Sequence, residues 1–336
     1  MNKFFKRVLT LSLTLALVGG GVSEALPNNT KGSTPVTFNQ QHSNLKIAGN
    51  LYLPKNYQPG KKYPAIITVH PGGGVKEQTS GLYAMKLAEK GYVTLAFDAT
   101  HQGESEGTPR YLENPADRVE DIRSAVDYLT TLPQVDADRI GVVGICAGGG
   151  FAINAAQTEY RIKAVATASA VDIGTTFRQG WTGDGTLESQ IATLNAIAKQ
   201  RTAEANGAAP QYTKYVPEQN EITADTHRDM AEASEYYRTK RGQHKNAANR
   251  VLFTSFDKVL AYNSFAQIDT LLTQPLLLIA GTEAGSLWQS QLAYDKATGS
   301  KELYLIDGAT HMDLYDIEKY VNQAVEKMNK FFKQNL

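Results

Sequence analysis

After residue 35, stretches with the apolar pattern of a strand alternate along the chain with stretches that have the apolar pattern of a helix. Residues 65–69, 93–97 and 140–143 form short, largely apolar runs with β-branched residues, which are typical of strands buried on both faces. Residues 83–90 have the pattern of a helix that stops at a glycine, and residues 114–129 space their apolar side chains along one helical face. This alternation predicts an α/β fold with a mostly parallel sheet covered by helices on both faces.

A long segment in the second half of the chain breaks this alternation. It is polar, rich in tyrosine and helical in pattern, and it is too long for a loop, so we expect a helical insertion. Strand-like runs resume at residues 275–279 and 302–306, and an amphipathic helix ends the chain. We therefore predict a core formed by residues 35–172 and 268–336 and a helical lid formed by residues 173–267.

The first 25 residues have the pattern of a secretory signal peptide. Lys3, Lys6 and Arg7 form a positive start, residues 8–18 are apolar, and Ser23-Glu24-Ala25 is a small-x-small cleavage site. The apolar run is short for a membrane-spanning helix, which needs about 20 residues. This pattern predicts cleavage of residues 1–25, export to the periplasm or the medium, and no stable membrane insertion after cleavage. The alternative is an uncleaved membrane anchor.

Composition narrows the range of partners. The 336 residues contain 34 Lys and Arg against 34 Asp and Glu, with no basic stripe or acidic tail, so nucleic acid is not an expected partner. Cys146 is the one cysteine in the sequence, so the chain forms no internal disulfide. The sequence has no ligand cluster of Cys and His, and we expect neither a metal nor an organic cofactor.

Cys146 lies in the motif that carries most information, Gly144-Ile145-Cys146-Ala147-Gly148, between a β-branched strand and a helix. Small residues on both sides permit a sharp turn that exposes the central side chain, as a catalytic nucleophile requires. We expect the start of the helix to lower the pKa of the thiol, and the backbone N–H of Ala147 to face the group that the sulfur attacks. The alternative is a glycine-rich turn whose thiol fills space.

Two further features fit a nucleophile at this place. Residues 70–74, His-Pro-Gly-Gly-Gly, follow a buried strand, where a glycine loop supplies a second N–H for an oxyanion. We expect the donor to be Gly73, with Gly74 next in line; the alternative is an ordinary glycine turn. Of the six histidines, His311 alone lies after the last strand and before the last helix, which is the position of a catalytic base.

The acid that orients the histidine has no single obvious candidate. The position where we expect it is occupied by Ala284, which leaves Glu283, one residue earlier, and Asp172, at the end of a strand. We favour Asp172 because it is short and ends a strand. For the substrate pocket we single out polar residues at the ends of strands, although a structural role in turns fits them equally: His70, Asp98, His101 and Glu104.

Together these motifs resemble the α/β-hydrolase superfamily, and within it the dienelactone-hydrolase-like branch in which cysteine replaces serine at the elbow. The likeness covers roughly residues 40–172 and 275–335. It rests on residues 70–74, 97–98 with 103–107, 144–150 and 308–313. The long insertion is similar to that of lid-bearing relatives, which include polyketide-transferase-like proteins.

The resemblance implies an exported hydrolase that cleaves a small-molecule ester or lactone. Cys146 would form an acyl-enzyme with His311 as base, and the N–H groups of Ala147 and Gly73 would hold the oxyanion. One alternative is an acyltransferase or cyclising enzyme of the same fold. Another is an exported binding protein that uses the hydrolase scaffold without turnover.

Overall fold

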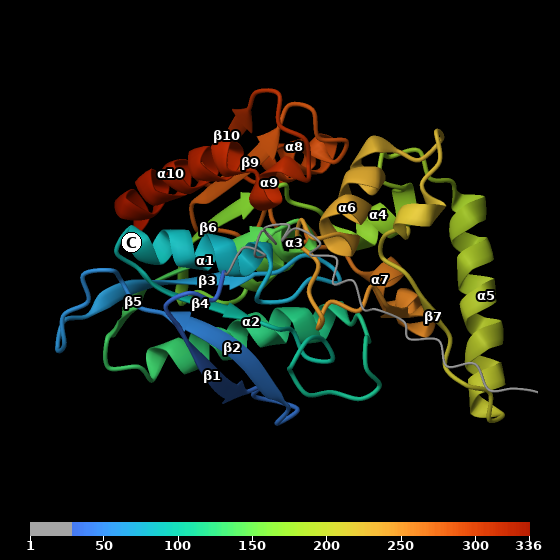
Figure 1. Cartoon of the computed structure of the whole chain (residues 1–336), viewed down its shortest axis with the longest axis horizontal. Coiled ribbons are helices and arrows are strands. Elements are labelled where there is room, and N and C mark those ends of the chain that lie inside the picture. The colour runs from blue at the N-terminus through green and yellow to red at the C-terminus, as the bar shows by residue number, and fades with distance from the viewer. Residues whose placement is uncertain (1–28) are drawn as a thin grey trace, which may run out of the picture.

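The computed structural model describes residues 29–336, which fold around an eight-stranded sheet (Figure 1). The expected signal peptide, residues 1–25, lies outside the described residues. The strands lie in the order β1-β2-β4-β3-β5-β6-β9-β10. Their bounds are Ser33–Asn39 (β1), Lys46–Tyr52 (β2), Tyr63–Val69 (β3), Val93–Phe97 (β4), Val135–Ile145 (β5), Ile162–Ala168 (β6), Leu276–Gly281 (β9) and Lys301–Ile306 (β10).

Most of the sheet is parallel. The neighbours from β4 through β3, β5, β6 and β9 to β10 all pair in parallel. β1 and β2 form an antiparallel ribbon at one edge, and β2 also pairs antiparallel with β4. The predicted mostly parallel sheet is therefore confirmed, and its strands point their carboxyl ends to one side, where ligands bind in sheets of this kind.

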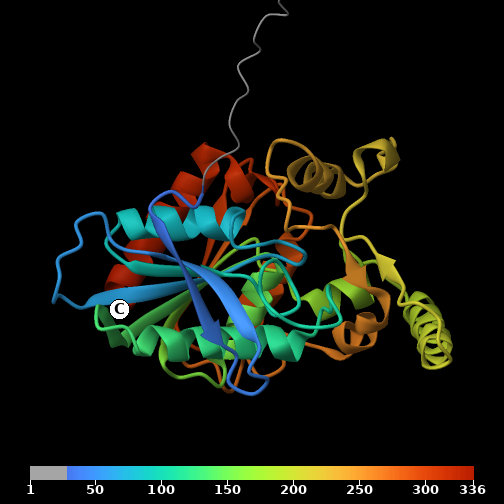
Figure 2. The same ribbon diagram turned by 60° about the horizontal axis from the view of Figure 1, so that its bottom comes forward.

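Helices cover both faces of the sheet (Figure 2). α1 (Thr79–Glu89) and α10 (Glu318–Asn335) pack on one face, and α2 (Pro115–Thr130), α3 (Ala147–Ala156) and α8 (Leu287–Lys296) pack on the other. Ile66 of β3 packs in the core on the side of α1 and α10, and its neighbour Ile67 packs in the core on the side of α2, α3 and α8. Successive strand residues point to opposite faces, so a strand covered on both sides is apolar at every position.

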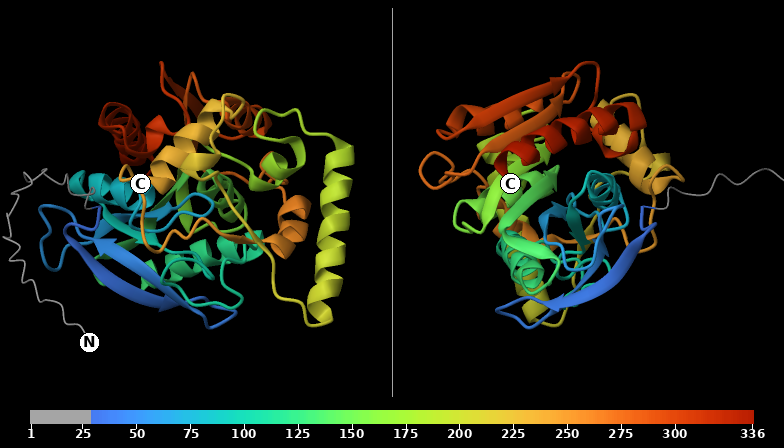
Figure 3. Two further views of the ribbon diagram at one scale, coloured as in Figure 1. Left: turned by 45° about the vertical axis from the view of Figure 1, so that its right-hand side comes forward. Right: turned by 90° about the vertical axis from the view of Figure 1, so that its left-hand side faces the viewer.

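The segment between β6 and β9 is mainly helical. It forms α4 (Ile173–Gln179), α5 (Leu187–Ala205), α6 (Arg228–Arg238) and α7 (Phe256–Ala261), with two 3₁₀ turns and the paired short strands β7 (Tyr212–Thr213) and β8 (Val251–Leu252). In Figure 3, α5 stands at one side of the molecule, and α6 lies between it and the C-terminal helices. The short helix α9 (Asp313–Asp316) precedes α10. Across residues 29–336, the helices lack the combination of length and apolar character needed to cross a bilayer.

Candidate active site

Cys146 occupies the sharp turn between β5 and α3, with φ 53° and ψ −123°. The flanking glycines make this turn possible. A Cβ on Gly144 would lie 2.2 Å from the carbonyl oxygen of Gly148, and a Cβ on Gly148 would lie 2.3 Å from that of Val69. Only glycine fits at either position, so the chain reverses tightly and directs the Cys146 side chain into a cavity.

The sulfur of Cys146 is surrounded by hydrogen-bond donors. The Tyr315 hydroxyl and the backbone N–H groups of Ala147 and Gly72 reach it. Burial nevertheless raises the pKa of the Cys146 thiol, and these donors offset the effect only in part. The expected lowering of this pKa by the start of α3 is therefore wrong, because desolvation outweighs the helix terminus, and the thiol is protonated at rest.

The two backbone N–H groups that reach the sulfur come from different elements. Ala147 begins α3, and Gly72 belongs to the loop after β3. The sequence pointed to Gly73, but the structure places Gly72 beside the sulfur instead. Gly73 has φ 68° and lies against the Tyr215 ring, which a Cβ there would approach to 2.5 Å. The N–H of Gly74 closes the turn onto the Pro71 carbonyl at 3.1 Å.

His70 stabilises this loop through hydrogen bonds. It does not line the cavity, which corrects its expected role in substrate binding. Its Nε2 accepts from the Ala99 N–H at 3.0 Å, so Nδ1 carries the hydrogen and donates to the Pro71 carbonyl at 2.7 Å. Arg118 donates to the His70 carbonyl at 2.8 Å. Burial, reinforced by Arg118, holds the pKa of His70 well below its usual value, so the ring stays neutral.

His311 lies in the loop between β10 and α9, with 1% of its surface exposed. Its Nδ1 is 2.6 Å from the Ser286 hydroxyl, and its Nε2 is 3.4 Å from the Tyr315 hydroxyl. Burial lowers the pKa of His311 to about 4, against an opposing effect of the Asp229 charge. Cys146 and His311 therefore face the same cavity as a neutral thiol and a neutral imidazole, with the Tyr315 hydroxyl in contact with both.

Neither candidate acid reaches His311. Asp172 caps α4, where it accepts hydrogen bonds from the Gly174 N–H at 3.1 Å and from the Ser264 hydroxyl at 3.0 Å. Glu283 points outward, with 57% of its side chain exposed, and pairs with Arg228 at 3.6 Å. The expectation that Asp172 or Glu283 orients the histidine is therefore corrected. Asp172 caps the N-terminus of α4, and Glu283 faces solvent.

Asp98 and Glu104 also lie outside the cavity, because both bind Lys76. The Lys76 ammonium is 2.8 Å from Asp98, 2.7 Å from Glu104 and 2.7 Å from Glu77. These three carboxylates form the one group within residues 29–336 that has the geometry of a metal site, and the ammonium already sits among them. The expected substrate contacts of Asp98 and Glu104 are thus replaced by a structural ion cluster.

His101 likewise turns away from the cavity. Its Nδ1 is 2.9 Å from the Pro109 carbonyl, and its Nε2 is 3.8 Å from Asp117. It has φ 68° in the turn that follows β4. Its place at the end of a strand was therefore a sign of turn structure and not of substrate binding.

The cavity beside Cys146 has a volume of about 210 Å³. Asp229 is the one acidic residue in its lining, and no lysine or arginine joins it among the described residues. The insertion supplies more than half of the walls. The lining residues are Gly72, Cys146, Ala147, Val171, Ile173, Thr176, Phe177, Trp181, Tyr215, Val216, Asp229, Met230, Ala233, Tyr237, His311, Met312 and Tyr315.

A model of the dienelactone hydrolase family matches residues 47–240. The chain belongs to the dienelactone hydrolase family. The uncharacterized protein YcjY of Escherichia coli (strain K12) is 41% identical over 299 residues, which cover 89% of this chain and 97% of YcjY. A thiohydrolase, aneE of Aspergillus aculeatus, is 28% identical over 276 residues, with 80% of this chain and 84% of aneE covered.

Solved structures confirm the expected α/β-hydrolase fold of this dienelactone hydrolase family member. The crystal structure of the hypothetical protein PA2218 from Pseudomonas aeruginosa superposes with a TM-score of 0.86 at 35% identity, covering 97% of this chain and 100% of that one. The α/β hydrolase GrgF from Penicillium sp. sh18 gives a TM-score of 0.74 at 22% identity, covering 90% and 98%.

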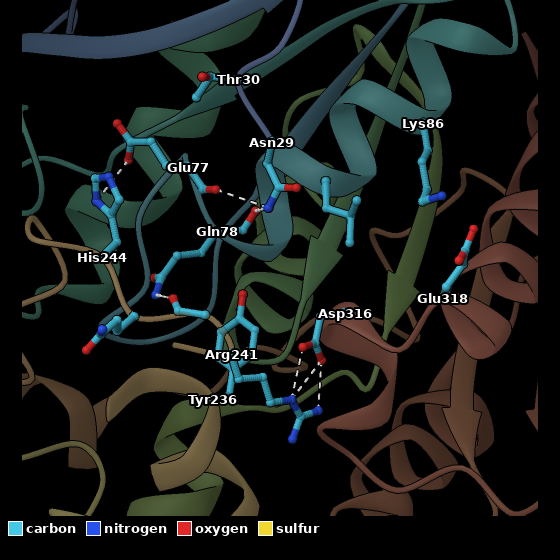
Figure 4. Close-up of a pocket in the computed structure, with 13 residues that line it drawn as sticks. Asn29, Thr30, Glu77, Gln78, Lys86, Tyr236, Arg241, His244, Asp316 and Glu318 are labelled. Carbon is cyan, nitrogen blue, oxygen red and sulfur yellow. Dashed lines mark hydrogen bonds and ion pairs between the residues drawn. The ribbon is translucent and has the colours of Figure 1, made fainter. Parts of the chain in front are cut away.

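A second cavity of this family member, about 290 Å³, lies where the insertion meets α1 and the start of α10 (Figure 4). It shares no lining residue with the first cavity. Arg241 holds Asp316 through two hydrogen bonds of 2.8 and 2.9 Å, and Gln78 donates to the Gly242 carbonyl at 2.7 Å. These contacts fasten the insertion to the core.

Sequence reasoning missed three residues of the site. Tyr315 follows His311 by four positions, a spacing that could have drawn attention to it. Ser286 lies in the loop where the acid is expected, two residues beyond Ala284. Asp229 belongs to the insertion, and no local pattern marks it, because only the tertiary fold brings α6 to His311.

Proposed function

We propose that this protein hydrolyses uncharged esters or lactones of small molecules through an acyl-enzyme on Cys146, with His311 as the general base. The observation that carries the proposal is the position of the Cys146 sulfur: it stands on a strained turn in a cavity, between two backbone N–H donors and a neutral histidine. Strained backbone of this kind persists where function requires it. Family membership and the thiohydrolase name of aneE are consistent with acyl chemistry.

The resting protonation states favour general-base catalysis over a preformed ion pair. At rest the Tyr315 hydroxyl donates to the sulfur, so it must first turn its hydrogen toward His311 Nε2. As Sγ attacks the carbonyl carbon, the thiol hydrogen then passes to the Tyr315 oxygen and the Tyr315 hydrogen passes to His311 Nε2. The carbonyl oxygen becomes an oxyanion that the N–H groups of Gly72 and Ala147 stabilise. The protonated histidine then gives its proton to the leaving alkoxide as the carbon–oxygen bond breaks, which leaves a thioester on Cys146.

Water completes the cycle. His311 accepts a proton from the water as its oxygen attacks the thioester carbon. The sulfur then leaves, recovers a hydrogen along the same route through Tyr315, and the carboxylic acid departs. The neutral imidazole and the neutral thiol are restored, so no proton or electron is left over.

The cavity wall indicates the substrate class. Its side chains are mostly apolar, and its one charged residue is negative, so a carboxylate on the substrate would meet repulsion and no cation. A cavity of about 150 Å³ is enough to hold benzene. The 210 Å³ here therefore accommodates an apolar acyl group of slightly more than that size.

The test combines p-nitrophenyl esters with labelling of Cys146. We expect hydrolysis of short neutral esters, its abolition in Cys146→Ala with an unchanged fold, and trapping of an acyl adduct on Cys146 by intact-mass analysis. Addition of an amine or alcohol acceptor separates hydrolysis from acyl transfer, because transfer yields the conjugate in place of the free acid. Turnover by Cys146→Ala would refute the mechanism, and absence of both turnover and adduct would favour a binding protein.

We also propose that the chain is exported, with residues 1–25 as the cleaved signal. The support is the sequence pattern of a positive start, an apolar run and a small-x-small site. Expression of the full chain in a bacterial host, followed by N-terminal sequencing of the periplasmic and secreted fractions, tests it. A mature chain that begins at Leu26 is expected, and a full-length chain confined to the cytoplasm would contradict it.

A further inference from the structure

Asp229 is a buried carboxylate that the insertion brings into the active-site cavity. It lies at the start of α6, and its side chain has no exposed surface. Its Oδ2 accepts hydrogen bonds from the Trp181 indole at 2.8 Å and from the Gly285 N–H at 2.8 Å. Its Oδ1 has no hydrogen-bond partner, and the half-exposed Arg228 guanidinium is 3.8 Å away. A buried carboxylate with an unpartnered oxygen is costly to the fold, so its presence here calls for an explanation.

Both donors to Asp229 are neighbours of His311. The Trp181 ring meets the imidazole edge-on, with ring centres 4.8 Å apart. Gly285 directly precedes Ser286, whose hydroxyl is 2.6 Å from His311 Nδ1. Asp229 therefore fixes both the Trp181 ring, which packs against the imidazole, and the loop that brings Ser286 to Nδ1.

Gly285 leaves the space that this arrangement needs. A Cβ at position 285 would lie 2.8 Å from Asp229 Oδ2 and 3.1 Å from Trp181 Nε1. Any side chain there would push the carboxylate away from the loop. The loop after β9 thus carries no acid of its own at Ala284 and Gly285, and it is shaped to accept one from the insertion.

We propose that Asp229, supplied by the insertion, is the carboxylate that positions His311 and stabilises its protonated form during acyl transfer. The proposal rests on the hydrolase function proposed above. The insertion would then supply one member of the Cys–His–Asp triad, and the core alone would supply only Cys146 and His311. Other groups have the wrong place for this role, since Asp172 caps α4 and Glu283 faces solvent.

The physical argument concerns the moment at which His311 becomes positive. In an apolar cavity, a nearby negative charge stabilises that cation more strongly than it would in water. Asp229 is the carboxylate whose charge raises the pKa of His311, opposing the larger effect of burial. The titratable groups around these two residues are Cys146, Tyr315, Arg228, His227 and Glu232. Glu283 lies beyond Arg228, and Asp313 lies beyond Glu232.

The decisive variant is Asp229→Asn, which keeps the shape and the acceptor oxygen and removes the charge. Titration of the His311 ring by NMR gives a readout independent of turnover. We expect the native ring to be about half protonated near pH 4 and the variant ring to remain mostly neutral there. For a neutral p-nitrophenyl ester, we expect kcat to fall on the order of a hundredfold with KM little changed.

Two further variants keep the test decisive. Glu283→Gln removes a nearby exposed carboxylate and should leave both the titration and kcat unchanged. Asp229→Glu restores the charge and should return the titration of His311 toward its native position even if kcat recovers only in part. If the His311 titration does not move in folded Asp229→Asn, the proposal is overturned. If native protein shows no ester turnover, the function fails while the titration still decides the role of Asp229.

Discussion

Tyr315 occupies the place where the thiol and the imidazole would otherwise meet. Its hydroxyl bonds to the Cys146 sulfur and lies 3.4 Å from His311 Nε2. Burial and the neighbouring Cys146 hold the pKa of Tyr315 well above its usual value, so the hydroxyl keeps its hydrogen. A neutral hydroxyl donates one hydrogen while it accepts another, which suits it to pass a proton without becoming charged.

Replacement of Tyr315 by phenylalanine tests this role. In Tyr315→Phe, the pKa of Cys146 should rise further, because a donor to the sulfur is lost, and kcat for a neutral ester should fall by roughly tenfold to a hundredfold. Stopped-flow ester hydrolysis and the pH dependence of iodoacetamide labelling measure the two effects. Tyr320→Phe, on α10 and 3.4 Å from the Gly308 carbonyl, is the matched control and should behave as native. Unchanged kcat in Tyr315→Phe would rule out the relay.

The sequence was informative where function depends on local geometry. Glycine spacing placed Cys146 on the strand–helix turn that the structure shows, since the clash of a Cβ at Gly144 or Gly148 is a property of neighbouring residues. The sequence does not reveal the environment of Asp98, because its partner, Lys76, lies 22 positions earlier. Single-sequence patterns do not reveal such long-range pairs.

At the scale of elements, α6 is attached at both ends to the part of the core that carries His311. Asp229 at its start binds Gly285. Beyond its end, Arg241 binds Asp316 of α9 and donates to the Met312 carbonyl at 3.3 Å. The helix is therefore attached both to the loop after β9, which carries Ser286, and to the segment that follows His311.

Loss of the second attachment should loosen α6. Arg241→Met removes a bidentate, partly buried ion pair, so we expect the free energy of unfolding to fall by ~1–2 kcal/mol and KM to rise several-fold. Urea unfolding and hydrogen exchange of the α6 amides measure these changes. Lys214→Met, which breaks an exposed pair with Glu221, should cost almost nothing. Native-like exchange in α6 of Arg241→Met would show that this ion pair does not hold the helix.

The core elements could be predicted better than the insertion. Strands β3 and β4 and the second half of β5, residues 140–145, are buried on both faces and therefore stand out as largely apolar runs. The insertion was expected to be helical, but the packing of α4 against α7 depends on contacts far apart in the chain, such as Arg178 with the Leu260 carbonyl at 2.7 Å. The spacing of apolar residues predicts that a helix forms, but it does not predict which element the helix packs against.

At the scale of the whole molecule, two buried groups give opposite dependences of stability on pH. The pKa of His311 is lowered to about 4, below its usual 6.5, so its contribution to stability is present above pH 6.5 and is lost as the pH falls through 4. Burial raises the pKa of Asp121 to about 7 from 3.8, so its contribution is present below pH 3.8 and is lost as the pH rises through 7. Between about pH 4 and pH 6.5, the effects of His311 and Asp121 on the free energy of unfolding largely cancel.

Variants should separate the two contributions. Between pH 7 and pH 5, we expect the free energy of unfolding of His311→Gln to rise relative to native by about 2 kcal/mol, and that of Asp121→Asn to fall by about the same amount. Urea unfolding at several pH values within this range measures both. If the curves of the two variants run parallel to that of the native protein, neither group titrates as its environment implies.

The backbone at Cys146 has a consequence for how such proteins diverge. A residue with a Cβ is held there at φ 53° and ψ −123°, which glycine would adopt with far less strain. Exchange of this one residue for glycine would thus relieve strain and forfeit the thiol. Where the thiol had no role, the gain in stability would favour that exchange, so a cysteine at this strained turn argues for a role of its side chain.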